Sequence, residues 1–381
     1  MQTKKLYYED AHIKSFEAKV ISCTPVKDGY EIVLDATAFY PEGGGQPCDL
    51  GTLGTANVLS VQEQADEIVH LCDQPLAAGS LVAGNICWNR RLDLMQQHSG
   101  EHMVSGVVHR RYGYHNVGFH MGADVVTIDF DGPIPQEDLQ QIEDAVNGFI
   151  WQNLPVKCYY PTQEELPNVH YRRKRDLPWP VRIVEIPDVD LCACCGTHVK
   201  NTGEVGLVKL LTCVKFHEGV RIEMVCGKRA LDMLSAAYEQ NRLVSQIFSA
   251  KAQETGAAAQ RMQDALVGEK FRAVNLEKRL FAFIGKTYEG KPLAIHFEQE
   301  LTPAANRQLC DAMAQHCAIA VALSGTDEAG YSFCIISRTQ DAKAIGTAAV
   351  QALQGRGGGK REAFQGSVAA TRQEIEAYFR F

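Results

Sequence analysis

Two short runs of residues, about a hundred positions apart, carry side chains of the types that bind metal ions. In the first run, QQHSGEH, the imidazoles of His98 and His102 are four residues apart, so on a helix they project from one face. In the second run, CACCGTH, a compact turn can aim the thiolate of Cys194 and the imidazole of His198 at one point. Histidine and cysteine are ligands that zinc prefers, although either pair alone is a weak signal.

These side chains need a helix and a loop to position them. Apolar residues recur at helical spacing on both sides of the histidine pair, which predicts a helix through it: Leu92, Met95, Val104, Val107 and Val108. A strand is predicted over Val181–Ile186, leading into the cysteine-rich run, and a hairpin over Leu207–Phe216 and Val220–Cys226. This mixture of helix and strand predicts an α+β unit around the site.

Taken together, HSGEH and the later run CCGTHVKNTGEVG resemble the zinc-binding editing domain of alanyl-tRNA synthetase and its free-standing relatives, the AlaX proteins. The resemblance implies a zinc ion held by His98, His102, Cys194 and His198. The sequence departs from the family at Cys195, where the family usually has glycine, and it adds Cys192. Either extra thiol could compete for the metal. His198, which ends a Gly-Thr turn, is expected to be the most mobile of the four ligands.

A glycine-rich run, FYPEGGGQP, resembles the loop that lines the editing pocket beside the zinc in the same family. Consecutive glycines let the backbone approach a ligand closely and adopt positive φ. The resemblance implies catalytic roles for Thr37, which falls where the family recognises the hydroxyl of serine, and for Gln46. It implies substrate binding by the three glycines of the run, Gly43, Gly44 and Gly45.

The chain of 381 residues is expected to be α+β and to divide into four parts. Residues 1–88 read as strands and turns, which predicts a small N-terminal β-barrel carrying the glycine-rich loop. Residues 89–226 contain both metal-binding runs and are expected to form an α+β domain, which the resemblance implies is the zinc-binding editing domain. Residues 227–284 show helical periodicity and predict a helical linker built as an antiparallel pair. Residues 285–381 alternate strands and helices, which predicts a C-terminal α/β domain. The family resemblance implies that this domain serves tRNA binding or assembly.

The C-terminal part contains a second glycine-rich run, GRGGGKR. It lacks the spacing and the Ser or Thr of a Walker phosphate loop. It resembles the glycine-rich signature of the C-terminal domain that alanyl-tRNA synthetases share with DHH phosphoesterases, where that domain helps to hold tRNA. The resemblance implies substrate binding by Arg356 and Lys360. A homodimer through the helical or the C-terminal region is a further expectation.

Composition narrows the class of protein. An apolar share of 45% with 22% charged residues is typical of globular proteins, and no run approaches the about 18 apolar residues of a membrane span. Thirteen cysteines without a secretory signal predict reduced thiols and a cytoplasmic location. A net charge of −8 argues against a protein that coats nucleic acid. Local basic clusters remain that could grip one nucleic acid in one orientation, among them Arg90-Arg91, His109-Arg110-Arg111 and Arg172-Arg173-Lys174-Arg175.

The resemblance covers most of the chain and implies a trans-acting, ATP-independent aminoacyl-tRNA deacylase, because 88 residues cannot hold a class II activation domain. Its implied substrate is tRNA(Ala) mischarged with serine or glycine. Zinc can lower the pKa of water to about 7 or polarise an ester carbonyl. A hydroxyl partner such as Thr37 can reject alanine, which lacks a hydroxyl.

Two alternatives stay open. Four protein ligands describe a closed structural zinc site, which would make the protein a tRNA-binding module without catalysis. The run His98–His102 also matches the His-x-x-Glu-His motif of inverted zincin peptidases, in which Glu101 would be the general base. FYPEGGGQP and CCGTH have no place in a peptidase, so Glu101 is expected to be a solvent-facing helix residue.

Overall fold

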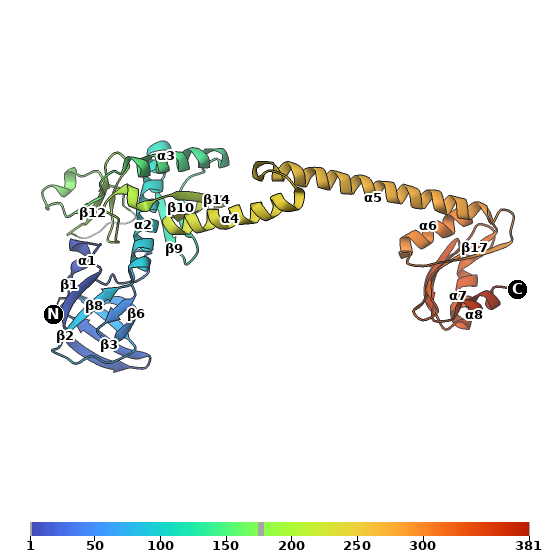
Figure 1. Cartoon of the computed structure of the whole chain (residues 1–381), viewed down its shortest axis with the longest axis horizontal. Coiled ribbons are helices and arrows are strands. Elements are labelled where there is room, and N and C mark those ends of the chain that lie inside the picture. The colour runs from blue at the N-terminus through green and yellow to red at the C-terminus, as the bar shows by residue number, and fades with distance from the viewer. Residues whose placement is uncertain (1, 174–178, 381) are drawn as a thin grey trace. The chain divides into compact units, whose positions relative to one another are not determined.

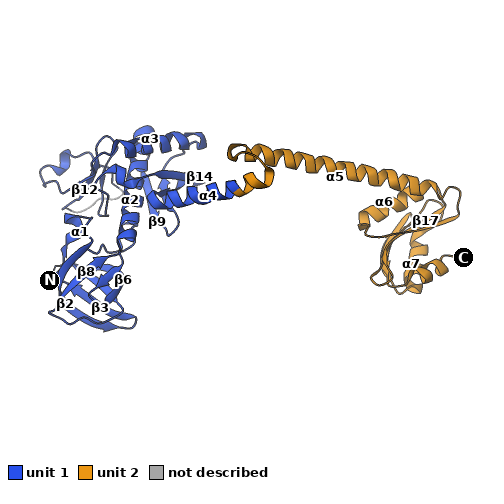
Figure 2. Cartoon of the chain, in the orientation of Figure 1, with its two compact units in different colours: residues 1–242 blue, residues 243–381 orange. Residues whose placement is uncertain are grey.

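The computed structural model describes residues 2–173 and 179–380 and divides into two compact units, residues 1–242 and 243–381 (Figures 1 and 2). The boundary falls inside helix α4, Gly227–Phe248. Both units mix helices and strands, which confirms the mixed α/β character expected from the sequence. The division into four domains stays a prediction. In the described ranges, every helix is too short or too polar to cross a membrane.

The N-terminal part of unit 1 is a barrel of antiparallel strands. The closed order is β2-β3-β7-β6-β5-β8, with bounds Ser15–Val26, Gly29–Leu34, Glu67–Cys72, Ala56–Gln64, Gly51–Leu53 and Leu81–Ile86. Alternation of side chains fills its interior, as in β6, where Ala56, Val58 and Val61 are buried. Outside the barrel, β1 (Lys4–Lys5) pairs in parallel with β4 (Ala36–Thr37), and α1 (Leu6–Glu9) lies between them in the chain.

Helix α2, Trp88–Tyr112, leaves the barrel and forms the centre of unit 1 (Figure 1). It is buried on nearly all sides from Leu94 to Val108, which explains why polar residues inside it are enclosed. At its first turn the guanidinium of Arg91 bonds to the carboxylate of Asp49, and both side chains are completely buried. This ion pair joins the helix to the barrel.

Two sheets and a second helix surround α2. The antiparallel order β14-β15-β10-β9 has bounds Val208–Phe216, Gly219–Cys226, Val126–Phe130 and Asn116–Met121. The second sheet is β11-β12-β13, Lys157–Tyr159, Ile183–Ile186 and Asp190–Ala193. The helical segments of this part are α3, Leu139–Gln152, and the 3₁₀ turns Gln136–Asp138, Leu166–Asn168 and Thr202–Val205. The hairpin β12–β13 ends at the cysteine-rich loop and carries it to α2.

Unit 2 is built on one mixed sheet. Its order is β16-β17-β18-β20-β19, with bounds Leu293–Glu298, Ile319–Thr326, Gly330–Ser337, Ala363–Val368 and Arg356–Lys360. The helical segments are a 3₁₀ turn, Ala252–Glu254, then α5, α6, α7 and α8, Thr255–Lys286, Pro303–Met313, Ala342–Ala352 and Arg372–Tyr378. The side chains packed between sheet and helices include Leu309, Ala320, Cys334 and Ile335.

The antiparallel pairing of the two linker helices stays a prediction. Large apolar side chains of both helices are exposed, including Ile247 of α4 at 75% and Phe271 of α5 at 70%. The helical periodicity is confirmed, since α4 and α5 span these segments.

Candidate metal centre

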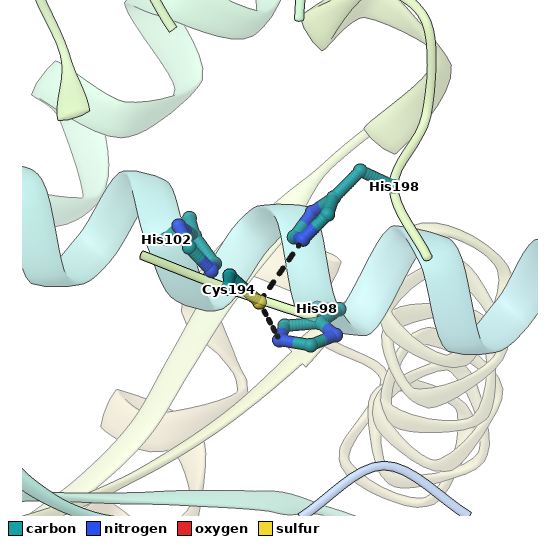
Figure 3. Close-up of side chains that lie close together, drawn as sticks. All are labelled: His98, His102, Cys194 and His198. Carbon is teal, nitrogen blue, oxygen red and sulfur yellow. Dashed lines mark hydrogen bonds between the residues drawn. The ribbon is translucent and has the colours of Figure 1, made fainter. Parts of the chain in front are cut away.

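The candidate ligands of the two runs QQHSGEH and CACCGTH lie close together in unit 1. His98, His102, Cys194 and His198 each offer one ligand atom, and these atoms all lie within 4.8 Å of one another. The Nε2 atoms of His98 and His198 are each 3.4 Å from the sulfur of Cys194 (Figure 3). The three imidazoles are buried, and the thiol is half-buried.

The His98 imidazole is oriented by the glycine-rich loop. Its Nδ1 lies 2.8 Å from Oε1 of Gln46, an acceptor, so Nδ1 carries a proton and Nε2 faces the sulfur of Cys194. The Gln46 amide is held in turn by Thr197, whose N–H donates to Oε1 and whose hydroxyl accepts from Nε2. Gln46 therefore lies beside the candidate metal centre, and its contacts are those of a residue that positions the His98 imidazole.

The other two imidazoles are oriented in the same way. Nδ1 of His102 lies 2.9 Å from Oδ2 of Asp190, and Nδ1 of His198 lies 3.2 Å from the hydroxyl of Ser99. Arg172 donates to both oxygens of the Asp190 carboxylate, from Nε to Oδ1 at 2.6 Å and from Nη2 to Oδ2 at 2.8 Å. All three Nδ1 atoms thus have outer partners, which leaves the three Nε2 atoms for a metal. His198 is held as closely as the other two, contrary to the mobility expected of it.

The local electrostatics favour a thiolate at Cys194. Burial on its own raises the pKa of this thiol, but the charges of His98 and His102, with hydrogen bonds from His102 and His198, hold the pKa well below its usual range. Burial lowers the pKa of His198 to about 3, so this imidazole is neutral. Cysteine binds metals as the thiolate and histidine binds them as the neutral imidazole, so Cys194 and His198 are in the forms that bind a metal.

The donor set fits zinc. One thiolate and three imidazole nitrogens are the ligands found in zinc sites, and their outer hydrogen bonds are of the kind that such sites use. A second group, His102, Asp190 and Cys192, also brings its ligand atoms within 4.8 Å of one another. It fits less well, because Arg172 neutralises Asp190 and burial raises the pKa of Cys192 to about 11. Cys192 therefore stays protonated and competes poorly with Cys194.

Gly196 is required by the close approach of the loop to α2. A Cβ atom at this position would lie 2.0 Å from Cε1 of His98 and 2.9 Å from Oε1 of Gln46. A Cβ atom essentially never comes this close to an atom to which it is not bonded, so any side chain would displace the His98 imidazole. This close approach explains why a glycine is needed at position 196 in CCGTH. The cysteine at position 195, where the family usually has glycine, does not change that requirement.

The glycine-rich loop is a tight turn in which Gly43 and Gln46 exchange two backbone hydrogen bonds. Gly44 and Gly45 have φ of 61° and 87°, which favour glycine. A Cβ at Gly45 would lie 2.7 Å from the ring of Phe119, and that ring stacks on His98 with centroids 5.2 Å apart. The loop therefore lies beside the candidate metal centre. The N–H of Gly43 donates to the carbonyl of Gln46 within the turn itself.

Thr37 has its hydrogen-bond partners in the barrel part of unit 1. It is fully buried, and its hydroxyl lies 2.9 Å from Nε2 of His70 and accepts from the N–H of Phe39. Burial lowers the pKa of His70 to about 4, and its Nδ1 donates to the carbonyl of Ile32. The neutral ring must therefore accept the Thr37 proton at Nε2. These partners belong to the barrel, so the role of Thr37 in recognising serine stays a prediction.

Two further expectations can be compared with the structure. Glu101 is only 2% exposed, so the expectation of a solvent-facing residue is wrong. Its Oε1 accepts from Ser105 and Asn116, because α2 is enclosed on all sides at this level. Arg356 and Lys360 begin and end the exposed edge strand β19 of unit 2. Their contact with substrate stays a prediction.

Two of the orienting residues, Asp190 and Ser99, were missed by the sequence analysis, whereas Gln46 was among its site residues. Asp190 is 88 positions from His102, and Ser99 is 99 positions from His198. Asp190 precedes the cysteine-rich run by two residues, which was the available signal for it. Ser99 lies inside HSGEH, but a serine within a helix gives no indication that its hydroxyl supports a distant imidazole.

A comparison with protein families matches residues 181–224 to the Threonyl and Alanyl tRNA synthetase second additional domain. This segment includes Cys194 and His198. The chain is 27% identical to the alanyl-tRNA editing protein Aarsd1 of Rattus norvegicus, over 98% of this chain and 96% of that protein. It is also 27% identical to the protein of that name from Danio rerio, over 97% and 95%.

Longer proteins match as well. An alanine–tRNA ligase of Thermofilum pendens is 30% identical over 97% of this chain, which spans 43% of the ligase. The solved C-Ala domain of Aquifex aeolicus alanyl-tRNA synthetase aligns with 24% of this chain and 90% of that domain, at 20% identity. Its TM-score of 0.21 is too low for a fold assignment.

Proposed function

We propose that this chain, which belongs to the AlaX-like alanyl-tRNA editing proteins, hydrolyses the ester that joins serine to tRNA(Ala). The observation that carries the proposal is the convergence of three oriented imidazoles and one thiolate. Two of the four side chains lie in the segment that matches the synthetase domain. Glycine, which lacks the methyl group of alanine, is a second candidate for the amino acid removed.

The chain's own residues would prepare the site for a zinc ion. His98, His102, Cys194 and His198 would hold it, with Gln46, Asp190 and Ser99 orienting the imidazoles. A bound zinc would lower the pKa of water or polarise the ester carbonyl. The half-buried Cys194 side chain marks where the centre is accessible, so a substrate ester would approach from that side.

A second candidate function is a tRNA-binding module whose zinc is structural. The convergence of four protein donors favours it, because catalytic zinc usually keeps one position open. Hydrolysis distinguishes the two candidates, since a structural site would leave the ester intact.

The direct test is deacylation of tRNA(Ala) charged with serine, alanine or glycine. We expect loss of the seryl ester at a rate well above that of the alanyl ester, and abolition of the activity when a chelator removes the metal. Re-addition of zinc should restore it. Binding of the tRNA without acceleration of hydrolysis would instead support the structural-zinc module.

Replacing Thr37 by valine is expected to reduce the preference for the seryl over the alanyl ester, because the hydroxyl that would read serine is removed. It should also destabilise the barrel by about 1–3 kcal/mol, because Nε2 of the buried His70 loses its donor. Thr37→Ser keeps the hydroxyl and is the matched control. A destabilised variant with an unchanged ratio of rates would assign Thr37 to the barrel alone.

We further propose a cytoplasmic location and a homodimer formed through the linker helices. The exposed apolar side chains of α4 and α5, such as Ile247 and Phe271, would then be covered by a second copy. Light scattering of the full chain should give twice the monomer mass, and a monomer at high concentration would contradict this arrangement.

A further inference from the structure

A hollow of about 660 Å³ in unit 1 brings together two basic clusters that lie about 60 residues apart in the sequence. One comes from the last turn of α2, and the other precedes the cysteine-rich hairpin. The basic side chains that line the hollow are His109, Arg110, His115, His170, Arg172 and Arg173. Lys174 and Arg175 of the second cluster lie outside the described residues. The volume is in the range of ligand-binding pockets.

The charge in this hollow is positive. Three guanidinium groups line the hollow together with the carboxylate of Asp190, which Arg172 already pairs with bidentately. His115 is paired with the carboxylate of Asp131, which does not line the hollow. Arg110 donates to the carbonyl of Asp188, and its guanidinium carbon is 5.9 Å from the centre of the Phe149 ring. These interactions hold the guanidinium groups of Arg110 and Arg172 in place, so planar donors are pre-organised for an anion with several oxygens.

The hollow adjoins the candidate metal centre through a single side chain. Asp190 lines the hollow, and its Oδ2 lies 2.9 Å from Nδ1 of His102. An anion bound by Arg110 and Arg173 would therefore be separated from the ligand atoms of the metal centre by the Asp190 carboxylate and the His102 ring. Tyr171 and His170 offer rings at the same place, and unpaired bases stack on such rings.

We infer that this hollow binds a phosphodiester group of the single-stranded acceptor end of the tRNA. The inference rests on the proposed function, because it assigns the anion to the substrate of the neighbouring centre. Arginine forks match phosphate oxygens, and an interaction of this kind positions a nucleic acid without reading its sequence. The hollow thereby fixes where the terminal ester arrives.

The test uses the full-length protein and the double variant Arg110→Gln/Arg173→Gln. Glutamine removes both charges and keeps a polar amide, but it is too short to replace the bond from Nη2 of Arg110 to the Asp188 carbonyl. The matched control is Lys27→Gln/Lys215→Gln, which removes two exposed charges of unit 1 that do not line the hollow. The two substrates are seryl-tRNA(Ala) and 3′-seryl adenosine, which carries the ester but no phosphate.

We expect the arginine variant to raise KM for seryl-tRNA(Ala) about tenfold with kcat unchanged. The slope of log affinity against log salt should fall by about 0.7 for each phosphate that the variant no longer neutralises. Hydrolysis of 3′-seryl adenosine should be unchanged in both variants. A decrease in affinity no greater than that of the lysine variant would overturn the inference, and so would an equal decrease in activity on both substrates.

Affinity for uncharged tRNA is measured on the same proteins, so the inference is judged even if neither ester is hydrolysed. If neither ester is hydrolysed but the double arginine variant still binds tRNA more weakly than the lysine variant does, the proposed function is rejected and the phosphate site is retained. Tight binding of inorganic phosphate that depends on both arginines, without any effect on tRNA affinity, would assign the hollow to a free anion and overturn the tRNA assignment.

Discussion

Replacing Cys194 by alanine is expected to remove most of the zinc and to lower hydrolysis of the seryl ester by more than about 100-fold. Loss of an outer partner of a metal ligand typically costs about 10–100-fold, and this change removes a ligand itself. Cys194 lies 3.4 Å from two of the three imidazole Nε2 atoms, and it is the donor whose pKa the site holds low. Metal analysis and the deacylation rate are measured on the same preparation.

Cys195→Ala is the matched control, because it removes the adjacent, exposed thiol from the same loop. Partial desolvation and the charge of Cys194 raise the pKa of Cys195, so it is the weaker metal donor. This variant should keep its zinc and its activity. Retention of full zinc in Cys194→Ala, or its loss in Cys195→Ala, would mean that the loop binds metal through the other sulfur.

Replacing Arg91 by methionine is expected to destabilise unit 1 by about 3–5 kcal/mol, because the buried carboxylate of Asp49 is left without a cation. Arg91 also donates to the carbonyls of Ala11 and Ala38, which lie outside α2, so the joint between helix and barrel is weakened. The three tryptophans of the chain, Trp88, Trp151 and Trp179, all lie in unit 1. Urea unfolding followed by tryptophan fluorescence therefore reports on this unit.

The control separates the missing cation from the missing packing. In Arg91→Met/Asp49→Asn the uncompensated charge is gone, while the new amide still accepts from the N–H of Tyr40. Part of the stability should return, since the cost of an isolated buried charge is removed. Arg90→Met, which gives up one hydrogen bond to the carbonyl of Cys48, should cost about 1 kcal/mol. Equal losses of stability at both arginines would contradict a special role for the ion pair.

Local patterns in the sequence were sufficient for several elements of the fold. The helix through His98 and His102 was predictable because apolar residues recur at its period, and α2 spans that stretch. The strand before the cysteine-rich run and the hairpin after it were predictable from β-rich runs bounded by turns, and β12, β14 and β15 occupy these segments. The periodicity of α4 and α5 was equally clear, but it cannot reveal whether an apolar stripe has a partner.

The sequence by itself determined the side chains of the candidate centre, because HSGEH and CCGTH bring their own ligands and the glycine that lets them meet. Only the tertiary structure decided how those ligands are oriented. Asp190 and Gln46 reach His102 and His98 across separations of 88 and 52 residues, and no local pattern encodes such contacts. Thr37 shows the same limit, since its hydroxyl is committed to His70 by the closure of the barrel and not by its neighbours in the chain.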